Sequence, residues 1–230
     1  MNRVDWLAEK RRGVEESFDT KFAVTYDEDE PAIDPTHRRF VMTLLEQCPA
    51  DGVVLDAACG TGKYFAMVLD AGRHVVGIDQ SAGMLARAST KFPSVDLHRT
   101  GLQEAGFQSE FDAVMCIGAM ENVPPEDWPA VLVALHRAVR PGGPVYLTVE
   151  MTDDEFITAA LEDASARGLP AVRGEDLRRG GGYHYYPALD QVRTWLEKAD
   201  LELVEEAHSP GEHFSYSYEH FLTRARAKDR

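Results

Sequence analysis

Residues 53–62 read VVLDAACGTG, a short apolar run that ends in two glycines. Such a run, followed by glycines, predicts a buried strand that turns abruptly into a helix. Glycine permits positive φ angles and lets the backbone approach a ligand closely. The first turn of the following helix also presents unpaired N–H groups. The stretch therefore predicts a ligand site at the end of a strand.

Strands and helices alternate on both sides of this turn. Apolar runs predict further strands at residues 74–78, 95–98, 111–117 and 145–149, with helical spacing between them. Two later runs, 201–204 and 218–223, predict an antiparallel C-terminal hairpin. We therefore predict an α/β fold with a doubly wound, seven-stranded, mostly parallel sheet and helices on both faces. Ligands bind such sheets outside the carboxyl ends of the strands.

The length of 230 residues predicts one domain. We expect it to consist of four segments: an N-terminal helical arm or lid (1–35), a cofactor-binding core (36–150), a substrate cap (151–188), and a last helix with the C-terminal strands (189–230). The cap is too short to be a docking domain for a macromolecule. A small organic substrate is therefore expected.

Charge and cysteine content restrict the partners. Lys and Arg number 24 against 39 Asp and Glu, a formal charge of −15 that disfavours nucleic acid. Cys48, Cys59 and Cys116 form no metal-binding spacing, so we expect no metal and a reducing, cytoplasmic setting. The longest apolar run, 113–120, is too short to cross a membrane. A chain of this kind is compatible with a homodimer.

An acidic residue lies where the second strand ends. Asp79 follows Gly62 by seventeen residues, and its carboxylate can accept both hydroxyls of a ribose. The glycine turn and Asp79 together predict a site for an adenosine-containing ligand. The alternative is a structural turn with an Asp on the surface. Phe65 stands where a dinucleotide fold has Gly or Ala, and Asp56 would repel a pyrophosphate. Lys63 lacks the frame of a P-loop, so NAD and ATP are disfavoured.

Four segments together resemble a known family. They are VLDAACGTGKY (54–64), VVGIDQSAGML (75–85), FDAVMCIGAMENVPPEDW (111–128) and LHRAVRPGGPVYLTVE (135–150). In this order they look like the S-adenosylmethionine-dependent methyltransferases with a Rossmann-like (class I) sheet. The resemblance is strong over residues 36–150. It implies S-adenosyl-L-methionine as cofactor and S-adenosyl-L-homocysteine as product.

The resemblance also implies which residues bind the cofactor. Many relatives carry an Asp-Ala pair in the loop that closes on the adenine, and here Gly101-Leu102 stands there, with Gln103 as a replacement. The implied contacts are Asp56, Ala58, Gly60 and Gly62 for the methionine part, Asp79 for the ribose, Gln80, Met84, Gly101, Leu102 and Gln103 around the adenine, Ile117 and Gly118 beside the amine, and Tyr26 as a lid.

Candidates for catalysis and substrate binding come from position. Glu121 follows an apolar run, so it is a candidate base or a clamp for a cationic substrate, the alternative being a solvated loop residue. His184 is a second candidate proton acceptor. Substrate contacts are expected from Glu150, Tyr183, Tyr185 and Tyr186. The alternative for the aromatic residues is that they anchor the cap to the core.

The function expected is methyl transfer from S-adenosylmethionine to an O or N atom of a small organic molecule by in-line displacement. The cofactor supplies an electrophilic methyl group, so positioning provides much of the acceleration. A non-catalytic S-adenosylmethionine-binding sensor or accessory protein is the first alternative. An NAD-dependent oxidoreductase and a protein or RNA methyltransferase are further alternatives.

Overall fold

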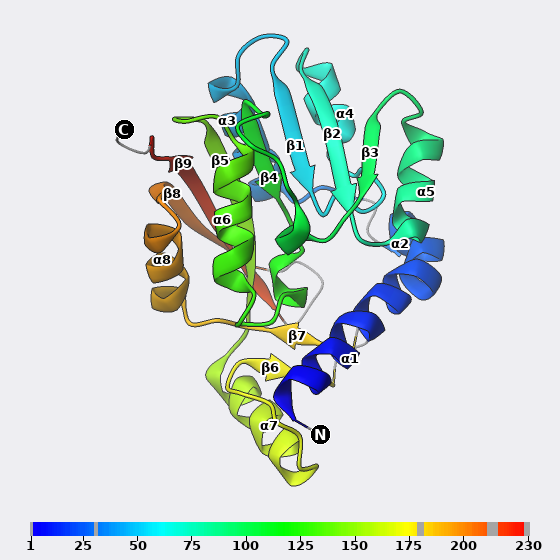
Figure 1. The fold of residues 1–230 in the computed structure, drawn as a ribbon, viewed down its shortest axis with the longest axis vertical. Coiled ribbons are helices and arrows are strands. Elements are labelled where there is room, and N and C mark those ends of the chain that lie inside the picture. The colour runs from blue at the N-terminus through cyan, green and yellow to red at the C-terminus, as the bar shows by residue number, and fades with distance from the viewer. Residues whose placement is uncertain (1, 30–31, 179–181, 211–215, 228–230) are drawn as a thin grey trace.

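A seven-stranded sheet forms the centre of the computed structural model, which describes residues 2–29, 32–178, 182–210 and 216–227 (Figure 1). The strand order is β3-β2-β1-β4-β5-β9-β8. The first five of these strands are parallel, and β9 pairs antiparallel with both β5 and β8. The predicted sheet is thereby confirmed. Its strands are β1 (Val53–Ala57), β2 (His74–Asp79), β3 (Asp96–Arg99), β4 (Ala113–Cys116), β5 (Pro144–Met151), β8 (Leu201–Pro210) and β9 (Ser217–Ala225).

Helices cover both faces because alternate strand residues point to opposite sides. Val54 packs into the cluster under the first helix group and Leu55 into the cluster under the second, and both side chains are fully buried. The first group is α3 (Pro35–Gln47), α4 (Phe65–Asp70) and α5 (Ala82–Lys91). The second group is α6 (Trp128–Ala138) and α8 (Leu189–Lys198).

Two additions lie outside this core. The arm consists of α1 (Arg3–Ser17), a π-helical turn (Phe18–Phe22) and α2 (Ala23–Asp29). In Figure 1 it runs diagonally below the carboxyl ends of β1 and β2. The cap contains α7 (Asp154–Ala166) and a short hairpin, β6 (Glu175–Asp176) with β7 (His184–Tyr185). The sequence had predicted no strands there, since two-residue strands leave no periodic pattern.

An ion pair joins the arm to the cap. The guanidinium of Arg3 lies 2.9 Å from a carboxylate oxygen of Glu175, whose side chain is buried. Trp6 of the arm packs edge-on against Tyr183 of the cap, with 6.1 Å between ring centroids. The arm is therefore held at its N-terminal end by the cap.

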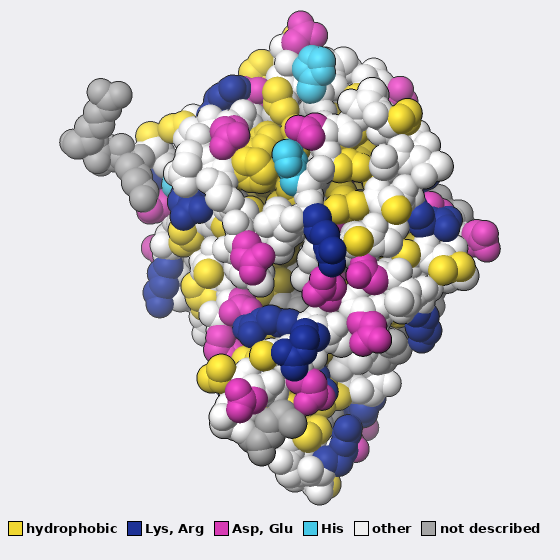
Figure 2. All heavy atoms as spheres, turned by 45° about the vertical axis from the view of Figure 1, so that its right-hand side comes forward, with side chains coloured by type: hydrophobic (Ala, Val, Ile, Leu, Met, Phe, Trp, Pro, Cys, Tyr) yellow, Lys and Arg dark blue, Asp and Glu magenta, His cyan; other side chains and the backbone are white. Residues whose placement is uncertain are grey.

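None of the helices in the described ranges has both the length and the apolar character that a bilayer crossing needs. On the face shown in Figure 2, Lys and Arg side chains are interspersed with Asp and Glu. Cys48, Cys59 and Cys116 are all free and buried.

Candidate active site

A cavity of about 930 Å³ lies at the carboxyl edge of the parallel strands. Residues at the ends of β1, β2 and β5 line one side, among them Asp56, Asp79 and Glu150. The arm contributes Phe18 and Phe22 to the cavity wall. The volume falls within the range of small-molecule sites, roughly 300–1,000 Å³.

Most of the residues predicted for the site line this one cavity. The lining includes Tyr26, Asp56, Ala58, Gly60, Asp79, Gln80, Met84, Gly101, Leu102, Gln103, Ile117, Gly118, Glu121, Glu150 and His184. Four predicted residues are not in the lining: Gly62, Tyr183, Tyr185 and Tyr186.

The glycine turn exposes backbone to the cavity at one position and packs tightly at another. A Cβ placed on Gly60, whose φ is +54°, would meet no atom within 4 Å, so the space above it is open to a ligand. A Cβ on Gly62, with φ +78°, would lie 2.6 Å from the ring of Phe65. Gly62 therefore allows the turn to pack tightly against the ring of Phe65.

The position of Phe65 corrects one step of the sequence argument. Its ring is fully buried and packs under Gly62 and Gly77, within the core. It does not occupy the cavity, so it does not crowd a ligand's pyrophosphate directly. The acidic Asp56 at the cavity wall is the feature that disfavours a pyrophosphate.

Two buried carboxyl groups form the wall below the turn. Asp56 is 1% exposed, and its Oδ2 atom has no hydrogen-bond partner. Burial, followed by the nearby charge of Asp79, raises the pKa of Asp56 to about 8. Asp79 accepts hydrogen bonds from the N–H groups of Gly60 at 2.9 Å and Ser81 at 2.8 Å. Burial raises the pKa of Asp79, and these N–H groups oppose the rise. A partner that carries positive charge or donates hydrogen bonds would stabilise the Asp56 carboxylate.

Acidic residues of the arm form hydrogen bonds that hold it next to the wall formed by Asp56 and Asp79. Asp19 accepts hydrogen bonds from the Ser81 hydroxyl at 2.7 Å and the Gly83 N–H at 3.1 Å, at the first turn of α5. Asp27 accepts from the Thr61 hydroxyl at 2.6 Å and from Lys91 Nζ at 2.9 Å. Two carboxylates thus bind the arm beside Asp79 and the glycine turn.

A methyl group at position 83 is expected to displace the arm. A Cβ on Gly83 would lie 2.4 Å from the backbone oxygen of Asp19. Gly83→Ala should therefore cost about 1–3 kcal/mol in urea denaturation and speed proteolysis within the arm. Gly13→Ala, in α1 with no atom within 4 Å, is the control and should be neutral or stabilising by up to ~1 kcal/mol. Equal stability of the two variants would contradict the proposed docking.

Two buried glutamates lie at the opposite end of the cavity. Glu121 belongs to a 3-10 turn (Met120–Asn122), and Glu150 lies near the end of β5 opposite Tyr218 of β9. Each glutamate side chain is only 5% exposed, so Glu121 is not a solvated loop residue. Burial and then the charges of Glu150 and Glu121 raise the pKa of Tyr218, which shows that all three are close together.

The tyrosines of the cap pack away from the cavity. The Tyr183 hydroxyl donates to buried Glu175 at 2.6 Å, and Tyr185 lies edge-on to Trp128 with centroids 6.3 Å apart. Tyr186 stacks on His184 with 6.2 Å between centroids. Tyr183 and Tyr185 also belong to the buried cluster around Trp128, so they anchor the cap to the core, which was the alternative interpretation. The contacts with Glu175 and His184 lie within the cap itself. Within this motif, His184 alone reaches the cavity lining.

Sequence reasoning missed several aromatic residues that line the cavity, among them His37, Tyr64 and Tyr218. The only local signal concerned His37. Asp34-Pro35 is a typical helix start, and it places His37 in the first turn of α3. Tyr64 follows the glycine turn, and Tyr218 lies in the hairpin of β8 and β9. At neither position does the sequence contain a pattern that indicates a ligand contact.

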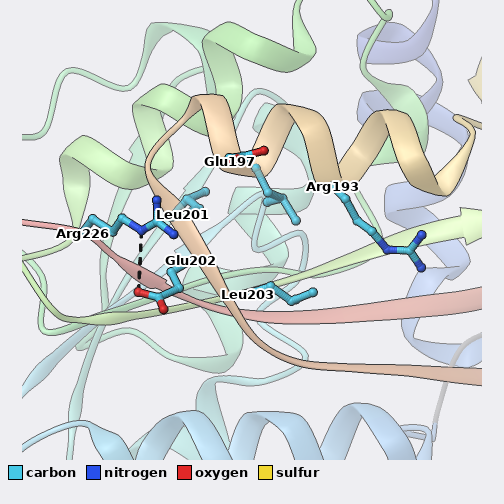
Figure 3. A pocket seen from close by; sticks show the side chains of 7 residues that line it. Arg193, Glu197, Leu201, Glu202, Leu203 and Arg226 are labelled. Atoms are coloured by element: carbon cyan, nitrogen blue, oxygen red, sulfur yellow. Dashed lines mark ion pairs between the residues drawn. The ribbon is translucent and has the colours of Figure 1, made fainter.

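A second, smaller cavity contains fewer groups that could bind or react with a ligand. It measures about 190 Å³ and lies between α8 and β8 (Figure 3). Two of its charged residues pair with each other, since Arg226 Nε lies 3.6 Å from Glu202 Oε2. Nowhere in the described ranges do three or more His, Cys, Asp or Glu side chains gather as a metal site. The larger cavity is therefore the candidate active site.

Comparisons with known proteins show which proteins this chain resembles. The model of a family described as "Methyltransferase domain" matches residues 54–143. An uncharacterized methyltransferase of Geobacillus kaustophilus is 28% identical over 186 residues, covering 80% of this chain and 83% of the relative. A ubiquinone biosynthesis O-methyltransferase of Xanthomonas axonopodis is 27% identical over 209 residues, covering 86% and 79%.

A solved structure extends the likeness to nearly the whole chain. The 1,6-didemethyltoxoflavin-N1-methyltransferase of Burkholderia thailandensis, solved with its substrate and S-adenosylhomocysteine, superposes with a TM-score of 0.72. The alignment covers 99% of this chain and 92% of that one at 18% identity. At this identity, the likeness concerns the fold.

Proposed function

This chain belongs to the class I S-adenosylmethionine-dependent methyltransferases, and from this premise we propose that it methylates an O or N atom of a small organic molecule by in-line displacement. Its cofactor is S-adenosyl-L-methionine, and its product is S-adenosyl-L-homocysteine. The observation that carries the proposal is one continuous cavity with two different ends. Asp56, Asp79 and the glycine turn form one end, while Glu121 and Glu150 form the other.

The residues at the first end fit the cofactor. Asp56 has a buried carboxylate oxygen without a partner, which suits the cationic amine of the methionine part. Gly60 leaves open space for close approach of a ligand to its backbone. Asp79, which also lines the cavity, would bind the ribose hydroxyls. Gln80, Met84, Gly101, Leu102 and Gln103, all in the lining, would surround the adenine.

The chemistry divides between cofactor and protein. The bound cofactor supplies a methyl group activated by a sulfonium. The chain must hold the acceptor in line with that methyl group and exclude water, which can contribute most of the acceleration. Phe18 and Phe22 of the arm close the cavity with apolar surface. Glu121 would remove a proton from the acceptor or bind its positive charge.

Two observations support a small acceptor over a macromolecule. The arm and the core share in lining the cavity, which leaves little room for a docked chain. Two of the named proteins act on small molecules: a ubiquinone biosynthesis O-methyltransferase and the 1,6-didemethyltoxoflavin-N1-methyltransferase. We extend this substrate class to the present chain.

Calorimetry followed by a transfer assay tests the proposal. We expect S-adenosylmethionine and S-adenosylhomocysteine to bind with micromolar affinity and NADH not to bind. Methyl-labelled cofactor should then label members of a panel of small amines, phenols and carboxylates. Binding of NADH would favour the oxidoreductase alternative. Cofactor binding without transfer would favour the sensor, and labelling of total RNA or of protein alone would favour a macromolecular substrate.

A further inference from the structure

His37 is held firmly at the cavity by the start of α3. The Asp34 carboxylate caps this helix and accepts hydrogen bonds from the N–H groups of Thr36 at 2.7 Å and His37 at 3.1 Å. The His37 side chain lines the cavity, although the residue is only 6% exposed. Backbone capping therefore fixes a buried imidazole beside the ligand space.

One nitrogen of this ring is paired and the other is not. Nδ1 lies 3.1 Å from the hydroxyl of Tyr64, and the ring lies edge-on to Tyr218, with 4.8 Å between centroids. Nε2 is buried without any hydrogen-bond partner. A buried polar atom left unpaired is costly, so native proteins rarely keep one without a use.

His220 provides the internal comparison. It lies 4.9 Å from His37 between ring centroids and is completely buried. Both of its nitrogens are satisfied, Nδ1 by the Tyr146 hydroxyl and Nε2 by the Ser209 hydroxyl, each at 2.8 Å. His220 is thus a structural histidine, whereas one ring nitrogen of His37 has no hydrogen-bond partner.

The position of His37 indicates which ligand it meets. Its neighbour Tyr218 lies in β9, opposite Glu150 of β5. Three strands separate β9 from β2, whose last residue is Asp79. Helix α3 packs over β4, β5 and β9. His37 therefore lies toward the end of the cavity that is left for the methyl acceptor.

The imidazole is neutral at physiological pH. Burial, opposed by the charge of Asp34 and assisted by that of Lys63, lowers its pKa to about 4. The other groups that face the ring are Tyr64, Tyr218 and His220. A neutral imidazole offers one donor or one acceptor and no charge.

We propose that His37 is an acceptor-binding residue whose Nε2 forms a hydrogen bond with an uncharged hydroxyl group of the methyl acceptor. This inference rests on the proposed function and specifies its substrate class. A hydroxyl both donates and accepts, so it satisfies Nε2 in either tautomer of the ring. A carboxylate would meet the charges of Glu121 and Glu150 at the same end of the cavity. An ammonium would be attracted by those glutamates independently of His37.

Three one-ring probes test the proposal on protein saturated with S-adenosylhomocysteine: phenol, benzoate and benzylamine. We expect phenol to bind the wild-type protein about tenfold more tightly than a His37→Phe variant, as one hydrogen bond predicts. His37→Gln, which places an amide near the Nε2 position, should restore part of this affinity. Benzoate and benzylamine should not respond to either substitution. On the wild-type protein, phenol should also shift the ¹⁵N resonance of His37 Nε2.

The outcomes separate this inference from the proposed function. S-adenosylhomocysteine should bind both variants within twofold of wild type, which also confirms that they fold. A tenfold loss of its affinity in folded His37→Gln would assign His37 to the cofactor and overturn the proposal. Equal phenol binding in wild type and His37→Phe, or no phenol binding and an unchanged Nε2 resonance, would overturn it too. Failure of wild type to bind S-adenosylhomocysteine would instead contradict the proposed function.

Discussion

An Asp79→Ala variant is expected to bind S-adenosylmethionine at least about 100-fold more weakly than the wild-type protein. Hydrogen bonds to a charged group contribute roughly 1.5–3 kcal/mol each, and two ribose hydroxyls can donate to this carboxylate. A loss of about 2.8 kcal/mol corresponds to the 100-fold change. The same carboxylate also accepts from the N–H groups of Gly60 and Ser81, so its removal disturbs the turn as well.

Two further variants separate these contributions. Asp79→Asn keeps the size and one acceptor oxygen, so its affinity should lie between those of wild type and Asp79→Ala. Asp96→Ala is the matched control, because Asp96 lies on the neighbouring strand β3 with an exposed side chain. Calorimetry should show unchanged binding for Asp96→Ala. An affinity for Asp79→Ala within threefold of wild type would exclude Asp79 as the ribose contact.

The sequence predicted Asp56 and Asp79 because their signals are local. Each lies in a short apolar run, and strand ends in a parallel sheet meet at one edge. The same logic predicted all seven strands of the central sheet. The central strands β1, β4 and β5 are buried on both faces and leave apolar runs that can be recognised without knowing the neighbours, whereas β3 and β8 are largely exposed.

The aromatic part of the cavity wall was harder to predict because it is assembled from distant segments. His37 precedes the first strand, Tyr64 follows the glycine turn, and Tyr218 lies in the last strand. Only tertiary packing brings these rings together, so no spacing in the sequence reveals them. The predicted substrate contacts of the cap tyrosines depended on a related ambiguity. Tyr183 looks the same in sequence whether it faces a substrate or, as here, hydrogen-bonds to Glu175 within the cap.

Binding of the cofactor is expected to release about one proton at pH 6–7, mainly from Asp56. In the free protein its pKa is raised to about 8, so the carboxyl group is protonated in this range. A cationic amine placed beside it favours the ionised form and expels the proton. Affinity should therefore rise about tenfold between pH 6 and pH 7, since one bound proton competes with the ligand. Both values lie below the pKa of an α-amino group, about 8, so the ligand keeps its charge.

Titrations at pH 7 in phosphate and in Tris measure the released protons, because the two buffers differ in ionisation enthalpy. Asp56→Asn should remove most of this difference and flatten the pH dependence, leaving only the contribution of Asp79, whose pKa is also raised. The pH dependence of the stability of the free protein provides an independent test of the raised pKa of Asp56. The folded state retains a proton on Asp56 that the unfolded chain loses near pH 4, so this group makes stability fall as pH rises from about 4 to about 8. Cofactor affinity that is equal at pH 6 and pH 7, with the same heat in both buffers, would mean that Asp56 does not meet the cationic part of the ligand.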